Sequence, residues 1–288
     1  MRARVGEAER LVHVARRNSL PPMRIGFIGA GKLAAAIAQG VIRAGVATSD
    51  EVIASARTPK RRDWFAREVG VRVTEDNSAV VGASEVVIIA TKPHDLPPAL
   101  GGVAHGLGDR LVISVAAGVR LADLQALSGP LSPLARVMPN TASLVGKGAA
   151  AYALGATAEL KHAKMVETIF GAVGDIHEVK EPLLDAVLGV SGSGPAYVLL
   201  MIEALSDGGV LMGLPRALAT QLATQTVAGA AELVRVTGQH PVLLREAVTS
   251  PGGTTAAALE VLEKAGFRSA VQRAVRAATE RSRELGSL

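Results

Sequence analysis

The chain has 288 residues, of which 49% are hydrophobic and 2% aromatic, and its formal net charge is +5 at pH 7. It contains no cysteine, which excludes disulfides, thiol nucleophiles, zinc–thiolate sites and iron–sulfur clusters. Its basic residues are scattered and aromatic side chains that stack on bases are scarce, so we expect an anionic small molecule as partner and no nucleic acid.

The N-terminal residues 1–22 are rich in arginine but lack the apolar core of a secretory signal. Glu7 and Glu9 argue weakly against a transit peptide. We predict a disordered extension ahead of a domain that starts at Met23, and a cytoplasmic location.

From Met23 to about Val179, short apolar runs typical of strands alternate with helical segments. The predicted strands are Met23–Ile28, Glu51–Ser55, Glu85–Thr91, Leu111–Ala117, Ala135–Asn140 and Gly148–Leu154. Helices are predicted over Lys32–Gly45, which stops at a glycine, and over Arg61–Gly70. The alternation predicts an α/β fold over residues 23–180, a doubly wound parallel sheet covered on both faces.

From Glu181 the strand-like runs disappear, and residues 181–288 form a second, all-helical region. The predicted helices are Pro195–Gly208, Pro215–Thr237, Pro241–Val248, Thr254–Gly266 and Phe267–Leu285. Three of them begin with proline, which suits the first helical turn.

The longest uncharged run, Ala186–Ile202, is short for a membrane span and contains three glycines, two serines and a proline. Within it, Gly189–Val198 is interpreted as a Gly/Ser loop that leads into a buried helix. No membrane partner is expected.

A glycine pattern lies between the first predicted strand and helix. Gly29-Ala30-Gly31-Lys32-Leu33-Ala34 matches G-x-G-x-x-[GA]. In dinucleotide sites the first glycine permits a tight turn, and the second lets the backbone approach a pyrophosphate at the helix N-terminus. A strand–helix turn that binds no ligand is the alternative.

The second predicted strand lacks the terminal Asp or Glu that binds the ribose 2′-hydroxyl of NAD. Ser55 and Arg57 stand there instead, and an arginine fork suits a 2′-phosphate. We predict that NADPH is preferred and that NADH is possible. The basic run Lys60–Arg62 behind them also fits a solvated helix start, so we do not assign all three residues to the cofactor.

Two later loops lie at the carboxyl ends of predicted strands, where ligands bind in such sheets. Ala90–Pro97 and Val115–Val119 pair small residues with tight turns, as close approach to a nicotinamide requires. Lys92 either meets a phosphate or faces solvent. His94 is interpreted as a loop histidine with a structural contact and not as a base.

The C-terminal region contains a second candidate site. Thr249, Ser250, Thr254 and Thr255 flank Pro251-Gly252-Gly253 at a helix start. Two glycines let the backbone fold into an anion-binding nest, and the helix dipole favours a carboxylate there. A helix cap without a ligand is the alternative.

Taken together, these segments resemble pyrroline-5-carboxylate reductases from about Met23 to Gly286. The most specific pieces are SGSGPAY with DGGVLMGLPR (Ser191–Arg216) and Leu244–Val271; IGFIGAGKLA, ATKPHDL, VISVAAGV and RVMPNTA occur in the expected order. The resemblance implies reduction of 1-pyrroline-5-carboxylate to L-proline with NAD(P)H, the last step of proline biosynthesis. It also implies a Rossmann domain followed by an all-α dimerisation domain that interlocks two protomers, with the active site completed across the dimer. Some members assemble five such dimers.

The resemblance also assigns site residues, with no metal. Ile28, Gly29, Ala30, Gly31, Lys32 and Leu33 would line the pyrophosphate, Ser55 and Arg57 would meet the adenosine side, Asn77 would contact the cofactor, and Ala90, Thr91, Lys92, Val115, Ala116 and Ala117 would border the ribose and nicotinamide. Ser250, Gly252, Gly253, Thr254 and Thr255 would hold the substrate. Ala142 stands where proline is common in the family, which would soften a loop. Ala247 and Gly238 stand where some members have an asparagine near the cofactor and an acid near the substrate, which puts those contacts in doubt but not the reaction.

The Thr255 hydroxyl is the candidate catalytic group. It would hydrogen-bond the ring nitrogen, either as a proton relay or only to orient an iminium that arrives protonated. Two alternatives are another imine or β-hydroxyacid reductase of the same architecture, and a non-catalytic NADPH-binding regulator. Hydroxyacid members usually use a lysine on a C-terminal helix, and Lys264 is the only lysine after Lys180.

Overall fold

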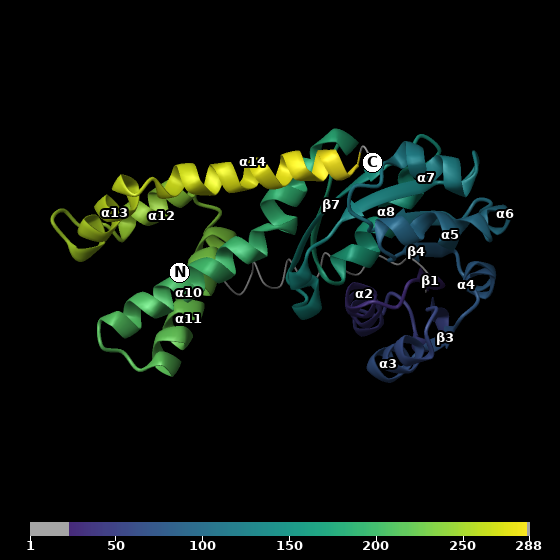
Figure 1. Ribbon diagram of the computed structural model, residues 1–288, viewed down its shortest axis with the longest axis horizontal. Coiled ribbons are helices and arrows are strands. Elements are labelled where there is room, and N and C mark those ends of the chain that lie inside the picture. The colour runs from purple at the N-terminus through teal and green to yellow at the C-terminus, as the bar shows by residue number, and fades with distance from the viewer. Residues whose placement is uncertain (1–22, 287–288) are drawn as a thin grey trace. The chain divides into compact units, whose positions relative to one another are not determined.

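The structure is a computed structural model that describes residues 23–286 (Figure 1). The predicted extension over residues 1–22 lies outside this range. The described chain forms two compact units, one of residues 23–195 with 275–286 and one of residues 196–274. The first unit extends beyond the predicted Rossmann segment 23–180, and the domain boundary at residues 180/181 stays a prediction.

The first unit is built on one eight-stranded sheet of order β3-β2-β1-β4-β5-β6-β7-β8. Its strands are β1 (Ile25–Ile28), β2 (Val52–Ser55), β3 (Arg72–Thr74), β4 (Val86–Ile89), β5 (Leu111–Ser114), β6 (Leu134–Met138), β7 (Gly148–Leu154) and β8 (Gly174–Glu178). Strands β1 to β6 are parallel, which confirms the predicted α/β class. The order reverses between β1 and β4, and ligands of doubly wound sheets bind in the crevice at such a switch point.

The far edge of the sheet corrects the expectation of an all-parallel arrangement. Strand β7 pairs antiparallel with β6, and β8 runs parallel to β7. Only Pro139–Lys147, with the 3₁₀-helix η3 (Thr141–Val145), connects β6 to β7. A parallel return needs a crossover of a dozen or more residues, so this short connection forces the reversal. Strands β3 and β8 were not among the predicted elements.

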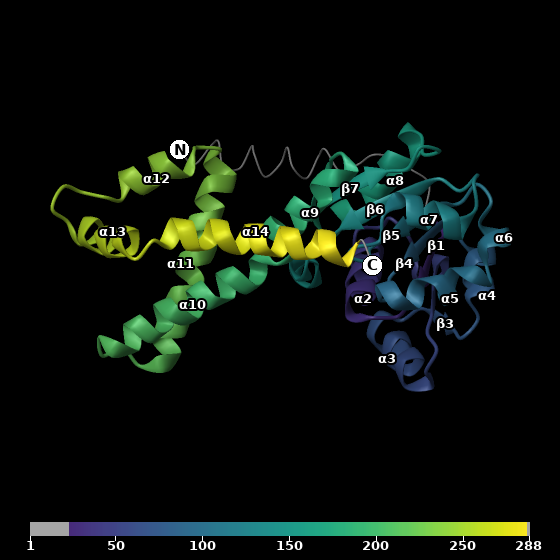
Figure 2. The same ribbon diagram turned by 45° about the horizontal axis from the view of Figure 1, so that its top comes forward.

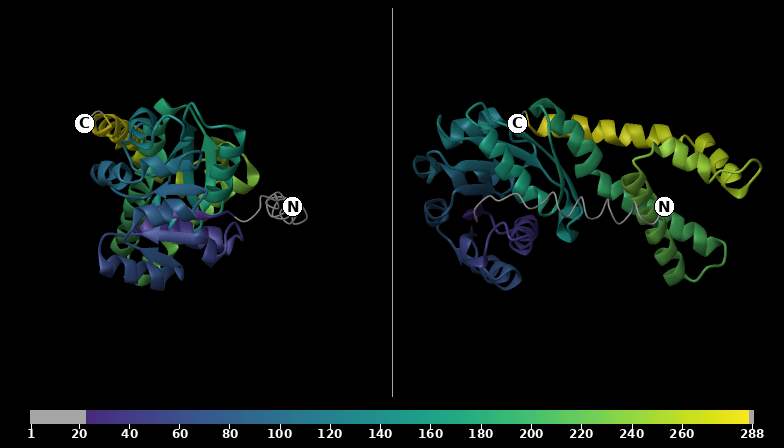
Figure 3. Two further views of the ribbon diagram at one scale, coloured as in Figure 1. Left: turned by 90° about the vertical axis from the view of Figure 1, so that its right-hand side faces the viewer. Right: turned by 180° about the vertical axis from the view of Figure 1, so that it is seen from behind.

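Helices cover both faces of the sheet, as predicted (Figure 1 and Figure 3). They are α2 (Lys32–Arg43), α3 (Pro59–Val69), α4 (Asn77–Ala83), α5 (Leu96–Gly101), α6 (Ala104–Leu107), α7 (Leu121–Ser128), α8 (Leu160–Gly171) and α9 (Leu184–Val187), with the short turns η1 (Ser49–Glu51), η2 (Pro93–Asp95) and η4 (Glu181–Leu183). Successive strand residues point to opposite faces. Thus Phe27 packs in the core under α2 and α8, whereas Ile28 packs in the core under α4, α5 and α7.

The second unit is all-helical, as predicted (Figure 2). Its helices are α10 (Gly194–Leu211), α11 (Arg216–Thr237), α12 (Pro241–Ala247), α13 (Thr254–Lys264) and the start of α14 (Phe267–Leu285). Helices α10 and α11 form a hairpin in which Ser206 Oγ and Thr220 Oγ1 lie 2.9 Å apart. The large apolar side chains of this region are mostly exposed in the single chain, Leu199 by 64% and Leu200 by 66%.

The predicted Gly/Ser loop over Gly189–Val198 is wrong, because this stretch is helical. The π-helical turn η5 (Leu188–Gly192) runs into α10. A Cβ on Gly189 would lie 2.4 Å from Thr279 Oγ1 and 2.7 Å from the Val275 carbonyl oxygen of α14. The glycine therefore serves close helix packing and not a loop.

The sequence predicts that the helix after this stretch is buried, and this prediction is also wrong. Glu181–Leu211 is the one helical stretch among the described residues that is long and apolar enough to cross a bilayer, and 11% of its apolar window is buried within the chain.

Candidate active site

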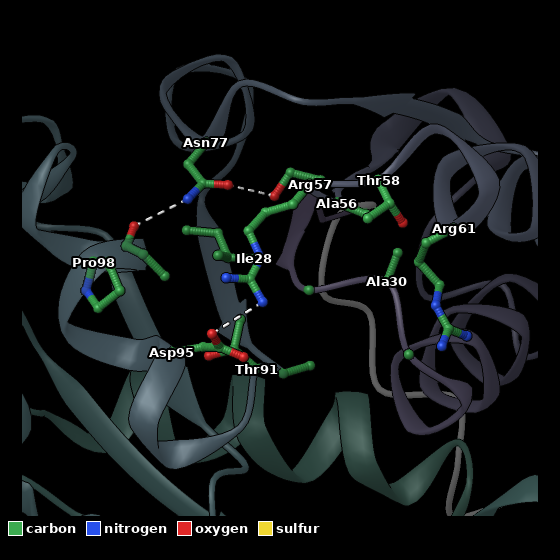
Figure 4. A pocket seen from close by; sticks show the side chains of 15 residues that line it. Ile28, Ala30, Ala56, Arg57, Thr58, Arg61, Asn77, Thr91, Asp95 and Pro98 are labelled. Carbon is green, nitrogen blue, oxygen red and sulfur yellow. Dashed lines mark hydrogen bonds and ion pairs between the residues drawn. The ribbon is translucent and has the colours of Figure 1, made fainter.

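A cavity of about 460 Å³ lies at the carboxyl ends of β1, β2 and β4, at the switch point of the sheet (Figure 4). Nine of the residues predicted to bind the cofactor line it: Ile28, Gly29, Ala30, Gly31, Ser55, Arg57, Asn77, Ala90 and Thr91. The other six do not line it: Lys32, Leu33, Lys92, Val115, Ala116 and Ala117. Six lining residues were not assigned to the cofactor from the sequence: Ala56, Thr58, Arg61, Asp95, Pro98 and Ala99.

Glycine stands at two positions of the β1–α2 turn for different physical reasons. Gly29 has φ +103°, and a Cβ there would lie 2.8 Å from the Ala90 carbonyl oxygen, so the fold itself requires glycine. Gly31 is the N-cap of α2 with φ −86°, and a Cβ on it would have no described atom within 4 Å. The protein's own packing therefore does not require Gly31, and the space over it opens into the cavity.

Thr91 contributes an unsatisfied polar atom to the cavity wall. Its Oγ1 is buried and finds no hydrogen-bond partner among the described residues. Native structures leave few such groups unpaired, and each calls for an explanation. Here a ligand with hydroxyl or phosphate oxygens could supply the missing partner.

A short chain of hydrogen bonds fixes one wall. The buried Ser55 hydroxyl donates to Asn77 Oδ1 at 2.6 Å, and Asn77 Nδ2 donates to the Ala99 carbonyl oxygen at 3.1 Å. These bonds join the end of β2 to α4 and α5. They hold this wall of the cavity in place and leave Asn77 one further N–H and one oxygen lone pair.

The start of α4 beside Asn77 is capped by a carboxylate. Asp76 Oδ1 accepts from the Ser78 backbone N–H at 2.8 Å. The hydrogen bonds from the Ser78 side chain and backbone hold the pKa of Asp76 below its ordinary value.

Arg57 reaches across the cavity mouth to Asp95 (Figure 4). Its Nη2 lies 3.0 Å from Asp95 Oδ1; the arginine side chain is 81% exposed and the aspartate 22%. Asp95 ends η2, in the loop after β4. His94 is 73% exposed, and its Nε2 lies 3.6 Å from Asp95 Oδ2, a contact that fits the structural interpretation of this histidine.

The three residues of the basic run Lys60–Arg62 make different contacts. Arg61 lines the cavity and its guanidinium lies 5.2 Å from the centre of the Trp64 ring. Arg62 Nη1 donates to the carbonyl oxygens of Ala56 and Arg57 at 3.0 and 3.1 Å, so it holds the turn after β2. Lys60 does not line the cavity, so the three basic residues do not act together on one ligand.

The predicted nicotinamide loop, Val115–Ala117, follows β5. Ala116 N–H donates to Ser114 Oγ at 3.2 Å. The next residue, Gly118, has φ +78°, and a Cβ there would lie 3.3 Å from the backbone of Gly286 at the end of α14. The C-terminal helix thus packs against the end of this loop.

The predicted substrate segment lies in the other compact unit. Gly253 N–H donates to the Ser250 carbonyl oxygen at 3.0 Å, and Gly252 has φ +68°, so a tight turn leads into α13. Thr254 and Thr255 occupy the first two helical positions, where backbone N–H groups lack helical acceptors. The structure thus brings Ser250, Gly252, Gly253, Thr254 and Thr255 together. Within the described range, no group of His, Cys, Asp and Glu side chains fits a metal ion.

Comparison with known proteins identifies the family. The chain is 48% identical over 264 residues to the pyrroline-5-carboxylate reductase of a Synechocystis species, covering 92% of this chain and 98% of that relative. The chain belongs to the pyrroline-5-carboxylate reductase family.

The family models and solved structures agree. Residues 181–285 match the model "Pyrroline-5-carboxylate reductase dimerisation", and residues 24–118 match "NADP oxidoreductase coenzyme F420-dependent". A pyrroline-5-carboxylate reductase from Coxiella burnetii superposes with a TM-score of 0.86 at 36% identity, covering 92% of this chain and 98% of that one. The Plasmodium falciparum pyrroline carboxylate reductase, solved with NADP bound, gives a TM-score of 0.84 at 32% identity, covering 93% of this chain and 100% of that one.

Proposed function

We propose that this member of the family reduces 1-pyrroline-5-carboxylate to L-proline, with NADPH as the preferred hydride donor. The observation that carries the proposal is the cavity at the sheet's switch point, lined by a glycine turn at a helix N-terminus. Family membership supplies the reaction, the last step of proline biosynthesis.

The residues present fit a dinucleotide. Gly31 has open space where a side chain would stand, and Thr91 Oγ1 lacks a partner among the described residues. The Gly29–Gly31 turn would hold the pyrophosphate, because the first N–H groups of α2 are free to bind an anion there. When bound, the nicotinamide supplies the hydride. The chain's own residues orient it and exclude water.

Arg57 supports NADPH over NADH. It lies at the end of β2, where Rossmann sites contact the adenine ribose. A guanidinium binds a phosphate through paired, charge-assisted hydrogen bonds. NADH remains a possible donor, because Asn77 and the glycine turn serve both dinucleotides alike.

The turn before α13 supports a carboxylate site. Gly252 is exposed and Gly253 is half-buried, neither has a side chain to cover the backbone, and the dipole of α13 adds partial positive charge. Within this turn Ser250 and Thr254 would hold the carboxylate, and the Thr255 hydroxyl would meet the ring nitrogen. Thr255 then either relays a proton or orients a substrate that is already an iminium.

The helical region supports a homodimer. All exposed large hydrophobic residues of the described chain lie between Leu183 and Leu285, except Leu131, Leu144, Val145 and Leu160. Apolar patches of this extent mark interaction surfaces. We propose that two copies interlock through residues 181–285 and that the partner completes the site. A decamer, a cytoplasmic location and the absence of nucleic-acid and membrane partners stay predictions.

A β-hydroxyacid reductase of the same architecture is less well supported. Lys264, the last residue of α13, is exposed and its Nζ bonds Glu260. A catalytic lysine must be buried beside its substrate. Lys264 is poorly placed for this role, because it lies at a helix end and pairs with a carboxylate on the same helix.

The test is NADPH consumption in the presence of 1-pyrroline-5-carboxylate, run beside NADH, with the product identified by chromatography. We expect substrate-dependent oxidation and L-proline as product. Binding of NADPH without oxidation would favour the non-catalytic regulator. Oxidation of NADPH only with another imine, or only with the oxo acid that a β-hydroxyacid reductase would reduce, would favour the other reductases.

A further inference from the structure

The ion pair between Arg57 and Asp95 joins two walls of the cavity. Arg57 follows β2, and Asp95 belongs to η2 after β4, on the other side of β1. Figure 4 shows the arginine side chain extended over the cavity, with its guanidinium at the aspartate. The cation predicted to bind a 2′-phosphate is therefore already paired with a carboxylate of the same chain.

The side chains of Arg57 and Asp95 differ in how freely they can move. Asp95 is 22% exposed and also faces His94, whereas Arg57 is 81% exposed. The guanidinium is thus the member that can turn toward an incoming anion. Arg61, the other arginine lining the cavity, stacks near Trp64, and Arg62 is held by backbone carbonyls and by Glu75 at 3.3 Å.

We propose that Asp95 is a specificity-determining residue that competes with the 2′-phosphate of NADPH for Arg57. Carboxylate and phosphate use the same donors of the guanidinium fork, so NADPH gains its contact only by displacing or sharing with Asp95. A phosphate beside the carboxylate is also repelled by it. NADH carries no 2′-phosphate and leaves the pair intact. Asp95 therefore lowers the preference for NADPH that Arg57 creates.

This inference rests on the proposed role of Arg57 in cofactor binding. Its direct test is Asp95→Asn, which keeps the side-chain shape and removes the charge. We expect NADPH to bind about fivefold more tightly at low salt, the scale of one partly exposed ion pair, and NADH to change by less than about twofold. The gain should shrink as salt rises, because the charges are near the surface.

The measurement is fluorescence titration of the full-length protein with NADPH and with NADH, in the absence of substrate. Glu85→Gln is the matched control. Glu85 pairs with Arg24 at 3.3 Å beside the first residues of β1 and β4, at the amino ends of these strands, whereas the cavity lies at their carboxyl ends. It adds the same unit of net positive charge without touching the site, so both dissociation constants should stay within twofold of the parent.

A double-mutant cycle with Arg57→Ala separates competition from direct repulsion. In that background Asp95→Asn should strengthen NADPH binding only by the smaller share that direct repulsion of the phosphate contributes. Four results would overturn the inference: unchanged or weaker NADPH binding in Asp95→Asn, equal strengthening of NADH, weaker NADH binding, or a full NADPH gain that persists without Arg57. Failure of the parent protein to bind either cofactor would instead contradict the proposed function, and an unchanged NADPH/NADH ratio in Arg57→Ala would contradict the role of Arg57.

Discussion

A Cβ on Gly29 would lie 2.8 Å from the carbonyl oxygen of Ala90. The turn after β1 and the loop after β4 therefore meet backbone to backbone at the point where the strand order reverses. Gly31, two residues later, has no such neighbour among the described atoms. Packing within the protein therefore requires the first glycine of the motif but not the second, which we propose serves the approach of the cofactor.

This contrast predicts opposite outcomes for two alanine variants. Gly31→Ala should leave the unfolding free energy of the cofactor-free protein within about 0.5 kcal/mol of the parent. It should weaken NADPH binding at least about tenfold, because the added methyl group occupies the pyrophosphate approach. Gly29→Ala should lower stability by about 1–3 kcal/mol, because φ is +103° and the Ala90 backbone is in the way. Denaturant unfolding and NADPH titration check both. A stability loss in Gly31→Ala as large as that in Gly29→Ala would contradict the distinction.

Arg57→Ala should weaken NADPH binding by about tenfold or more, since a charge-assisted bond to phosphate is lost, while NADH changes little. The ratio of the two dissociation constants is the measurement. Lys60→Ala, next to the cavity but not lining it, is the control and should preserve the ratio. An unchanged ratio in Arg57→Ala would remove this residue from the phosphate site.

Thr255→Ala should lower turnover by about a hundredfold, the scale of one positioned proton-transfer group, with NADPH affinity nearly unchanged. Thr255→Ser should keep most of the activity, because the hydroxyl remains. Thr224→Ala is a matched control on α11, where the hydroxyl bonds only the Thr220 carbonyl oxygen at 2.8 Å in the described structure. Steady-state kinetics and cofactor titration should be compared. Parallel loss of turnover and affinity in Thr255→Ala would contradict the assigned role.

Tyr152 gives a prediction about alkaline stability. Burial and the carboxylates of Glu167 and Glu178, 2.8 and 3.2 Å from its hydroxyl, raise its pKa well above the ordinary value. The folded protein therefore keeps the proton at a pH where the unfolded chain loses it. This contribution is fully present below about pH 10 and declines above it, as the unfolded tyrosine ionises.

Tyr152→Phe removes that titration, so unfolding free energy should fall less steeply above about pH 10 than in the parent. At neutral pH the variant should be about 1–3 kcal/mol less stable, because the carboxylates of Glu167 and Glu178 share the single O–H donor of Tyr152 and lose it. Urea unfolding at several pH values tests this. Identical pH slopes in the two proteins would show that the tyrosine does not carry the effect.

Much of the fold follows from local sequence patterns. Predicted strands such as Glu85–Thr91 contain the observed ones, here Val86–Ile89, and the surplus residues at the carboxyl end of this strand, Ala90 and Thr91, line the cavity. Helix ends marked by proline and glycine, as at Pro241 and Gly70, were found within a few residues. These features depend on nearest neighbours, so the sequence specifies them directly.

Three features depended on tertiary structure and were missed. The direction of β7 is set by the short Pro139–Lys147 connection and not by the strand's own composition. Gly189 serves packing against α14, which a local pattern does not distinguish from a loop. Asp95 lies in the predicted loop Ala90–Pro97, but its pairing with Arg57 joins residues from two different βα units, which no local pattern indicates.

The most direct test of the central claim is isotope transfer. NADPH deuterated at the transferable position of its nicotinamide is incubated with the protein and 1-pyrroline-5-carboxylate, and proline is analysed by mass spectrometry and NMR. The account predicts one deuterium per proline, on the δ carbon that was the imine carbon of the substrate. Unlabelled proline, or no proline from protein that binds NADPH, would contradict it.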